Sequence, residues 1–183
     1  APHATSEHFD ELRGQVSGTQ TALSADWAEF FSQIDASGLQ DFDRRSDELT
    51  RQVRDNGITY NIYADQDGPQ RPWSVDLFPL IVGHDDWQQI EAGTLQRARL
   101  LEKMIADVYG PQQLLRDALI PSALVQGHPG YLRAMHGVTP AGGNYLQLVA
   151  LDLARGPDGH WSVVSQRTQA PSGLGYLLEN RTL

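Results

Sequence analysis

Cysteine is absent from all 183 residues, which excludes disulfide bonds, thiolate metal sites and a cysteine nucleophile. Long apolar runs are missing too, since no stretch approaches the ~18 residues that a membrane-spanning helix needs. The first thirty residues show no basic segment followed by an apolar one, as a signal peptide would. From these absences we expect a soluble, cytoplasmic protein with no membrane partner.

Positive charge is scarce. Lys and Arg number 14 against 23 Asp and Glu, which gives a formal net charge of −9. A chain of this charge repels a phosphate backbone at long range, and no basic stripe with interleaved aromatic residues offsets that repulsion. We therefore expect no nucleic-acid partner.

Common catalytic motifs are absent as well. No two of the six histidines lie at i and i+4, and no H-E-x-x-H occurs, so no zinc site is predicted. Ser172 lies in Pro-Ser-Gly rather than in G-x-S-x-G, which argues against a serine hydrolase. Residues 65–68 (DQDG) open like a calcium loop but lack its later ligands, so a turn is favoured there.

The first 57 residues read as a helical segment. Residues 1–20 are polar and are expected to be loose. Ser24 is the predicted cap of a helix whose apolar side chains recur at helical spacing: Trp27, Phe30, Phe31 and Ile34. A second helix is predicted after Gly38, and it should end at Asn56-Gly57. Asp41 and Arg45 are spaced to form an ion pair on its surface. Its apolar face consists of Leu39, Phe42, Leu49 and Val53.

Residues 58–183 are expected to form a second domain of mixed strands and helices. Residues 58–63 alternate as a strand does, and 73–82 form a second apolar segment, an edge or bend because of Pro79. A long helix is predicted over 86–109, capped by Asp85 or Asp86. Another helix should follow Gly110-Pro111, with four side chains turned inward: Leu114, Leu115, Ala118 and Leu119.

The end of the chain carries the clearest local signal. Residues 144–155 and 160–166 read as two strands joined by the tight turn GPDG at 156–159, which predicts a β-hairpin. A helix should begin after Pro-Ser-Gly. Helices first, then strands mixed with helices, indicate an α/β or mixed α+β fold.

The Pro-Ser-Gly loop has two interpretations. A Ser-Gly pair just before a helix can offer free N–H groups to an anion, or it can simply cap the helix, which the residues alone favour. If an anion binds, its candidate ligands are Arg167, Ser172 and Gly173, with Asn180 and Arg181 on the following helix. The last two can instead serve the helix itself.

Six segments in a fixed order resemble the circularly permuted ATP-grasp family over roughly residues 57–183. They are GITYNIYAD (57–65), DLFPLIV (76–82), the helix of 87–110, LIPSALVQGHPGYLR (119–133), PAGGNYLQLVALDLAR (140–155) and PSGLGYLLENR (171–181). The resemblance implies an ATP-grasp-like fold similar to that of carboxylate–amine ligases such as glutathionylspermidine synthase, which use ATP and Mg²⁺.

The chain departs from active-looking members at one place. In active-looking members the second hairpin strand ends in Glu-Asp-Asn, and the glutamate and the asparagine are positioned like metal ligands. In this chain the strand ends in Ser165, Gln166 and Arg167. Mg²⁺ prefers carboxylate oxygens. An Arg at roughly 4 Å would repel it by about 8 kcal/mol at an effective dielectric constant of ~20. We therefore expect no metal site and no catalytic residue in this chain.

RTQAPSG (167–173) resembles the inactive branch of the family, whose members are often fused to a helical domain called alpha-E and are associated with a peptide synthesis or modification system. The family's domain continues beyond residue 183, so the chain reads as an amino-terminal fragment. Three functions stay open: a degenerate module that binds a partner, peptide or nucleotide without turnover, a ligase active with ATP and Mg²⁺ only in the full-length protein, and a structural scaffold for the helical domain.

Overall fold

The computed structural model describes residues 8–16, 22–34, 41–57 and 73–183. The chain divides into two compact units, each of which is considered by itself. The first unit contains residues 1–83, 155–160 and 172–183, and the second contains 84–154 and 161–171. The division that the sequence predicts at residue 57 stays a prediction.

A small hairpin opens the first unit. Strand β1 (Phe9–Asp10) pairs antiparallel with β2 (Gln15–Val16), so the expectation of a loose start is wrong for this stretch. The turn depends on Asp10, which is 6% exposed and binds the Arg13 guanidinium at 2.8 Å. Gly14 completes the turn at φ +64°, where a β-carbon would be strained. Such short strands carry too little alternation to be recognised in a sequence.

An aromatic cluster joins the helices of the first unit, and it consists of Trp27, Phe30, Phe31, Phe42 and Phe78. Helix α1 (Ala25–Gln33) is capped as predicted, with Ser24 accepting from the Trp27 amide, and Trp27 is 6% exposed. Helix α3 (Phe42–Asp55) buries Val53 and ends at Asn56 and Gly57 as predicted. Asp41 pairs with Arg44, not with the expected Arg45. Leu39 lies outside the described residues.

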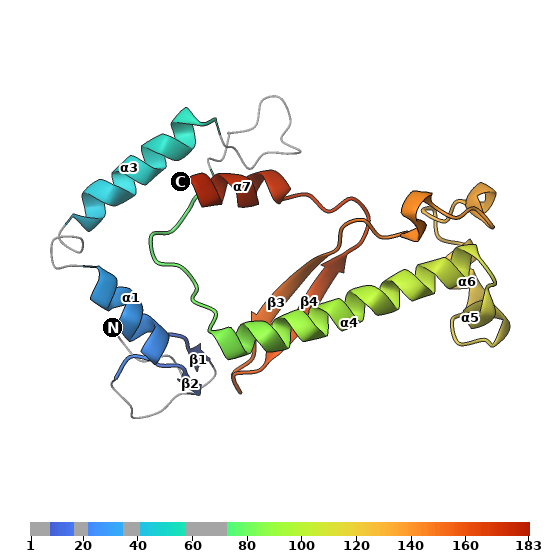
Figure 1. The fold of residues 1–183 in the computed structure, drawn as a ribbon, viewed down its shortest axis with the longest axis horizontal. Coiled ribbons are helices and arrows are strands. Elements are labelled where there is room, and N and C mark those ends of the chain that lie inside the picture. Colours follow the sequence, from blue (N-terminus) through green and yellow to red (C-terminus); the bar gives the residue numbers. More distant parts are fainter. Residues whose placement is uncertain (1–7, 17–21, 35–40, 58–72) are drawn as a thin grey trace. The chain divides into compact units, whose positions relative to one another are not determined.

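Residues 73–82 link this cluster to the last helix. They form no edge strand, but the chain bends at residues 77–78, directly before Pro79, which is the other outcome predicted for this segment. Phe78 stacks on Phe42 with ring centroids 5.0 Å apart. Trp73 stacks on Tyr176 of helix α7 (Leu174–Thr182). This helix forms after the Pro-Ser-Gly loop as predicted (Figure 1). The segment is therefore fixed by its aromatic side chains rather than by a sheet. The strand predicted at 58–63 lies outside the described residues.

Helix α4 (His84–Tyr109) is the long helix of the second unit. It begins two residues earlier than expected, so Asp85 and Asp86 lie in its first turn instead of capping it. They still favour the helix, because acidic side chains complement the positive end of its dipole.

The chain turns back sharply after α4. Asp107 accepts backbone amides from Gln113 and Leu114, both at 2.9 Å, and so starts the short helix α5 (Gln113–Arg116). The prediction of a longer helix with Ala118 and Leu119 inward is wrong, since Ala118 has a φ of 55° and Leu119 is 70% exposed.

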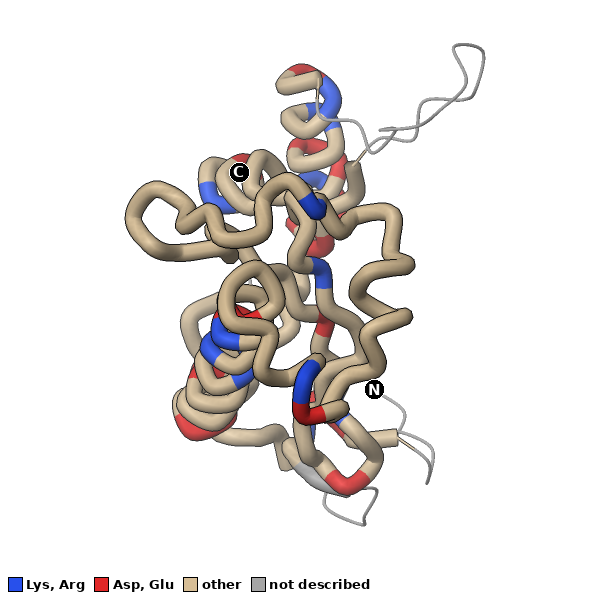
Figure 2. The backbone as a smooth tube through the Cα atoms, turned by 90° about the vertical axis from the view of Figure 1, so that its right-hand side faces the viewer, with Lys and Arg blue, Asp and Glu red and all other residues tan. Residues whose placement is uncertain are grey.

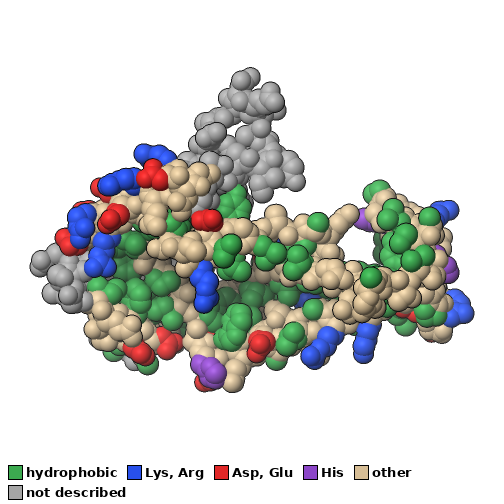
Figure 3. Space-filling view, turned by 45° about the horizontal axis from the view of Figure 1, so that its top comes forward, with side chains coloured by type: hydrophobic (Ala, Val, Ile, Leu, Met, Phe, Trp, Pro, Cys, Tyr) green, Lys and Arg blue, Asp and Glu red, His purple; other side chains and the backbone are tan. Residues whose placement is uncertain are grey.

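Short elements fill the stretch up to residue 149: helix α6 (Ser122–Gln126) and the 3₁₀ turns η1 (Arg133–Met135) and η2 (Ala141–Gly143). Stacked rings tie them to α4, because Tyr109 lies 5.3 Å from Tyr131 and 6.1 Å from Tyr145. Exposed apolar side chains gather around this end of the unit (Figure 3): Leu119, Leu124, Leu132, Met135 and Val138.

The predicted hairpin is confirmed, with a shorter first strand. Strands β3 (Ala150–Arg155) and β4 (Trp161–Arg167) form a two-stranded sheet, whereas residues 144–149 are not strand. The carboxylate of Glu102 on α4 accepts the amides of Tyr145 and Leu146, both at 2.8 Å. Those two N–H groups are thus bonded to a helix instead of a neighbouring strand.

Charges of both signs are interspersed along the described chain (Figure 2). None of the helices in the described ranges combines the length and the apolar character that crossing a bilayer requires. The architecture is a mixed α/β one, as the sequence predicts.

Candidate site at the end of the hairpin

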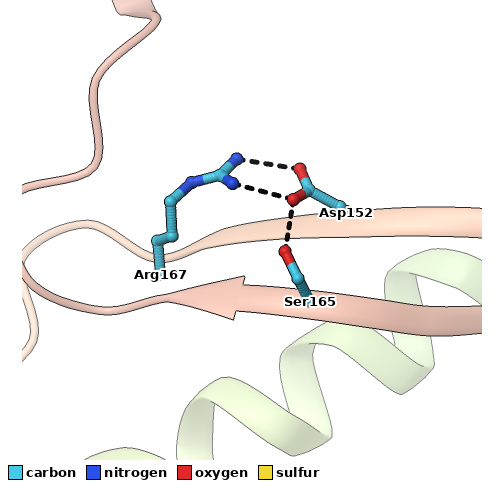
Figure 4. A network of polar contacts seen from close by, with 3 residues as sticks. All are labelled: Asp152, Ser165 and Arg167. Atoms are coloured by element: carbon cyan, nitrogen blue, oxygen red, sulfur yellow. Dashed lines mark hydrogen bonds and ion pairs between the residues drawn. The ribbon is translucent and has the colours of Figure 1, made fainter.

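The last residues of β4 form a polar cluster with the neighbouring strand. Arg167 donates two hydrogen bonds to Asp152 on β3, one to each carboxylate oxygen and each 2.8 Å long. The hydroxyl of Ser165 donates to the same carboxylate (Figure 4). This paired geometry matches the planar guanidinium to the planar carboxylate.

The cluster changes the acidity of its carboxylate. The hydrogen bond from Arg167 lowers the pKa of Asp152 most, and the bond from Ser165 lowers it further. The side chains remain 54% and 44% exposed for Arg167 and Asp152, so water and salt screen their attraction. Asp152 is therefore a carboxylate held in its charged form by its partners.

The tripeptide itself holds no carboxylate, but the folded hairpin brings one to it, and sequence reasoning missed this. The repulsion expected between Arg167 and a divalent ion is reduced, because Asp152 neutralises the guanidinium. Both carboxylate oxygens are already occupied by Arg167 and Ser165. A metal ion at Asp152 would have to compete with the Arg167 guanidinium for the same two oxygens. In the described ranges, no three acidic or histidine side chains gather as a metal site.

A signal for Asp152 did exist in the sequence. Strands joined by a tight turn place residues at similar distances from that turn opposite each other. Counted inward from the ends Arg155 and Trp161 of the two strands, Asp152 is three positions and Ser165 four positions along. The predicted hairpin thus brought the two strands together here, but the residue order did not show that Asp152 pairs with Arg167.

The Pro-Ser-Gly loop takes the form of a helix start. Gly173 occupies the cap position of α7 with φ 119° and accepts the amide of Leu177 at 3.0 Å, while no side chain caps the helix. Ser172 is exposed and makes no capping bond. The helix is therefore capped by the backbone of Gly173, and the Ser172 side chain does not cap it.

The two candidates on α7 have different surroundings. Asn180 accepts a hydrogen bond from the Trp73 indole at 2.8 Å, so its amide oxygen helps to hold the 73–82 segment. Arg181 is exposed. Arg167 belongs to the second compact unit, whereas Ser172, Gly173, Asn180 and Arg181 belong to the first. The anion-binding role of these five residues stays a prediction.

Comparison with known proteins gives one family. The profile described as circularly permuted ATP-grasp type 2 matches residues 79–183, a later start than the residue 57 predicted from the sequence.

Relatives extend over more of the chain. An uncharacterised protein of Mycobacterium tuberculosis is 36% identical over 188 residues, which cover 98% of this chain and 20% of that protein. One of Mycobacterium leprae is 33% identical, covering 94% of this chain and 29% of its own length. One of Synechocystis is 34% identical, covering 68% and 26% respectively. The chain thus spans less than a third of the length of these relatives.

Proposed function

This chain belongs to the circularly permuted ATP-grasp type 2 family, and on that premise we propose that it is a degenerate module that binds without turnover. Its ligand is a protein partner, a peptide or a nucleotide within a peptide synthesis or modification system. The full-length protein, not this chain alone, is the unit in which the activity must be tested.

The Asp152–Arg167 pair is the observation that carries the proposal. The resemblance implies that active members place a glutamate and an asparagine at the positions of Ser165 and Arg167, where they ligate Mg²⁺. Here the Asp152 carboxylate, across the hairpin, is bound to a guanidinium through two hydrogen bonds. Phosphoryl transfer from ATP depends on a cation that neutralises the phosphates, and a committed carboxylate supplies no ligand for it.

Exposed apolar side chains support a protein partner over a free nucleotide. On α7, Leu174, Leu177 and Leu178 are 59%, 68% and 62% exposed. Their spacing at i, i+3 and i+4 puts them on one face of the helix, and Tyr176 and Asn180 pack against Trp73 on another. An apolar helix face of this kind suits an amphipathic helix, as the alpha-E-type domain would provide. The same feature also supports a purely structural scaffold.

A phosphate-release assay separates a degenerate module from a working ligase. Full-length protein with ATP, Mg²⁺ and candidate amines should release no phosphate above background. Amine-dependent release would assign the chain to the ATP-dependent carboxylate–amine ligases and end the proposal. Melting temperatures measured with ATP, with and without Mg²⁺, separate nucleotide binding from scaffolding, because only a bound ligand stabilises the folded state.

The strand end can be tested directly by freeing the carboxylate. Arg167→Asn removes the cation and leaves Asp152 with only Ser165, so the affinity of full-length protein for Mn²⁺, followed by electron paramagnetic resonance, should increase. Arg181→Asn removes another exposed arginine and serves as the matched control. An unchanged Mn²⁺ affinity in Arg167→Asn would show that the ion pair is not what keeps metal away.

A further inference from the structure

A hollow of about 800 Å³ lies within the second unit, between α4 and β4. Its volume is within the range of small-molecule sites. The α4 side consists of Gly93, Gln96, Arg97 and Leu100, and the β4 side of Trp161, Ser162 and Val163. Neither the Asp152–Arg167 pair nor the Pro-Ser-Gly loop lines it.

Gly93 is the first indication that the hollow is kept open. It lies inside a 26-residue helix, where glycine is less stable than alanine. Its backbone needs no glycine, because its φ is not positive and a β-carbon would meet no atom within 4 Å. The fold of the described residues therefore gives no reason for a glycine here. A side chain at position 93 would take up part of the hollow on the side that α4 lines.

The composition of the lining indicates what fits. Arg97 is the one charged residue among the described residues that line the hollow. Its guanidinium donates one hydrogen bond, 3.4 Å long, to the amide oxygen of Gln166 on β4. A guanidinium has five N–H donors, so it can serve a second acceptor. Apolar surface comes from Leu100, which is 58% exposed, and from Trp161 and Val163.

We propose that this hollow binds an organic anion made of a carboxylate joined to an aromatic or branched apolar group. The carboxylate pairs with Arg97, and the apolar group lies over Gly93 between Leu100 and Trp161. This site requires neither ATP nor a metal ion, so it does not depend on the Asp152–Arg167 pair.

The experiment uses full-length protein, without ATP or Mg²⁺, and two probes that differ only in charge: N-acetyl-phenylalanine and its carboxamide. Saturation-transfer NMR and competition titrations give the dissociation constants. The carboxylate should bind about threefold more tightly, which is the scale of an exposed ion pair. Arg97→Gln should abolish that preference, whereas Arg99→Gln, on the same helix but outside the hollow, should retain it.

A steric pair of variants tests the placement. Gly93→Leu fills the hollow and should weaken binding about tenfold, while Gln88→Leu adds the same side chain elsewhere on α4 and should not. Gly93→Ala stabilises the helix and should weaken binding less, so it covers the case in which Gly93→Leu fails to fold.

Three results would overturn the proposal: equal affinity for the two probes, binding unaffected by Gly93→Leu and Gly93→Ala, or no binding at all. The last result, together with a lower melting temperature of Gly93→Leu, would mean that another part of the full-length protein fills the hollow.

Discussion

Replacing Glu102 by Ala should release residues 144–149 from helix α4. The carboxylate accepts two backbone amides, those of Tyr145 and Leu146, at 2.8 Å each. A hydrogen bond to a charged group contributes about 1.5–3 kcal/mol. Because Glu102 is only half-buried, the lower end applies, and the two bonds together contribute about 3 kcal/mol.

Amide hydrogen exchange measures this loss where it occurs. Since each 1.4 kcal/mol is a factor of ten, the amides of Tyr145 and Leu146 should exchange about a hundredfold faster in Glu102→Ala. Glu102→Gln retains one acceptor oxygen and should give an intermediate rate. Lys103→Ala, the exposed neighbour on the same helix, should change nothing. Equal exchange in Glu102→Ala and the unmodified protein would refute the reasoning, because the segment would then be held by something other than this carboxylate.

Three more predictions follow from single contacts. The pKa of Asp152 is lowered below its ordinary 3.8, so the stability that its contacts give is present above pH 3.8 and is lost as the pH falls through the lowered value. Arg167→Gln should therefore raise the Asp152 pKa in a carbon-detected NMR titration, and an unchanged pKa would contradict this. Gly173→Ala places a β-carbon at φ 119° and should destabilise by about 1–2 kcal/mol in a denaturant titration, whereas Gly175→Ala inside the same helix should stabilise by about 1 kcal/mol. Asp107→Ala removes two amide acceptors at the start of α5 and should cost about 1–2 kcal/mol, visible as a lower melting temperature. No change would mean that water replaces the carboxylate at no cost.

Local signals in the sequence predicted local structure well. Ser24 ahead of a 3/4-spaced apolar run predicted α1, and GPDG between two apolar stretches predicted the β3–β4 hairpin. In both cases residues that are close in sequence make the deciding contacts, so the pattern and the structure depend on the same physical cause.

Predictions failed where a distant residue decides the outcome. Residues 144–149 alternate as a strand does, but Glu102, more than 40 positions away, binds their amides. The 73–82 segment is fixed by stacking of Phe78 on Phe42 and of Trp73 on Tyr176. Asp152 was missed for the same reason, because its partner Arg167 is reached only across the hairpin. A sequence does not display such pairings until the fold is known.

The way in which the two compact units share the chain limits how they can be separated. The backbone passes from one unit to the other four times, after Gly83, Ala154, His160 and Pro171. A protease that cuts at any one of these borders leaves both units linked through the others. Residues 84–171 contain the second unit in full, with only residues 155–160 of the first, whereas nothing shorter than the whole chain contains the first unit. Trimming the gene from its ends can therefore give the second unit with a single short piece of the first, but it cannot give the first unit without the second.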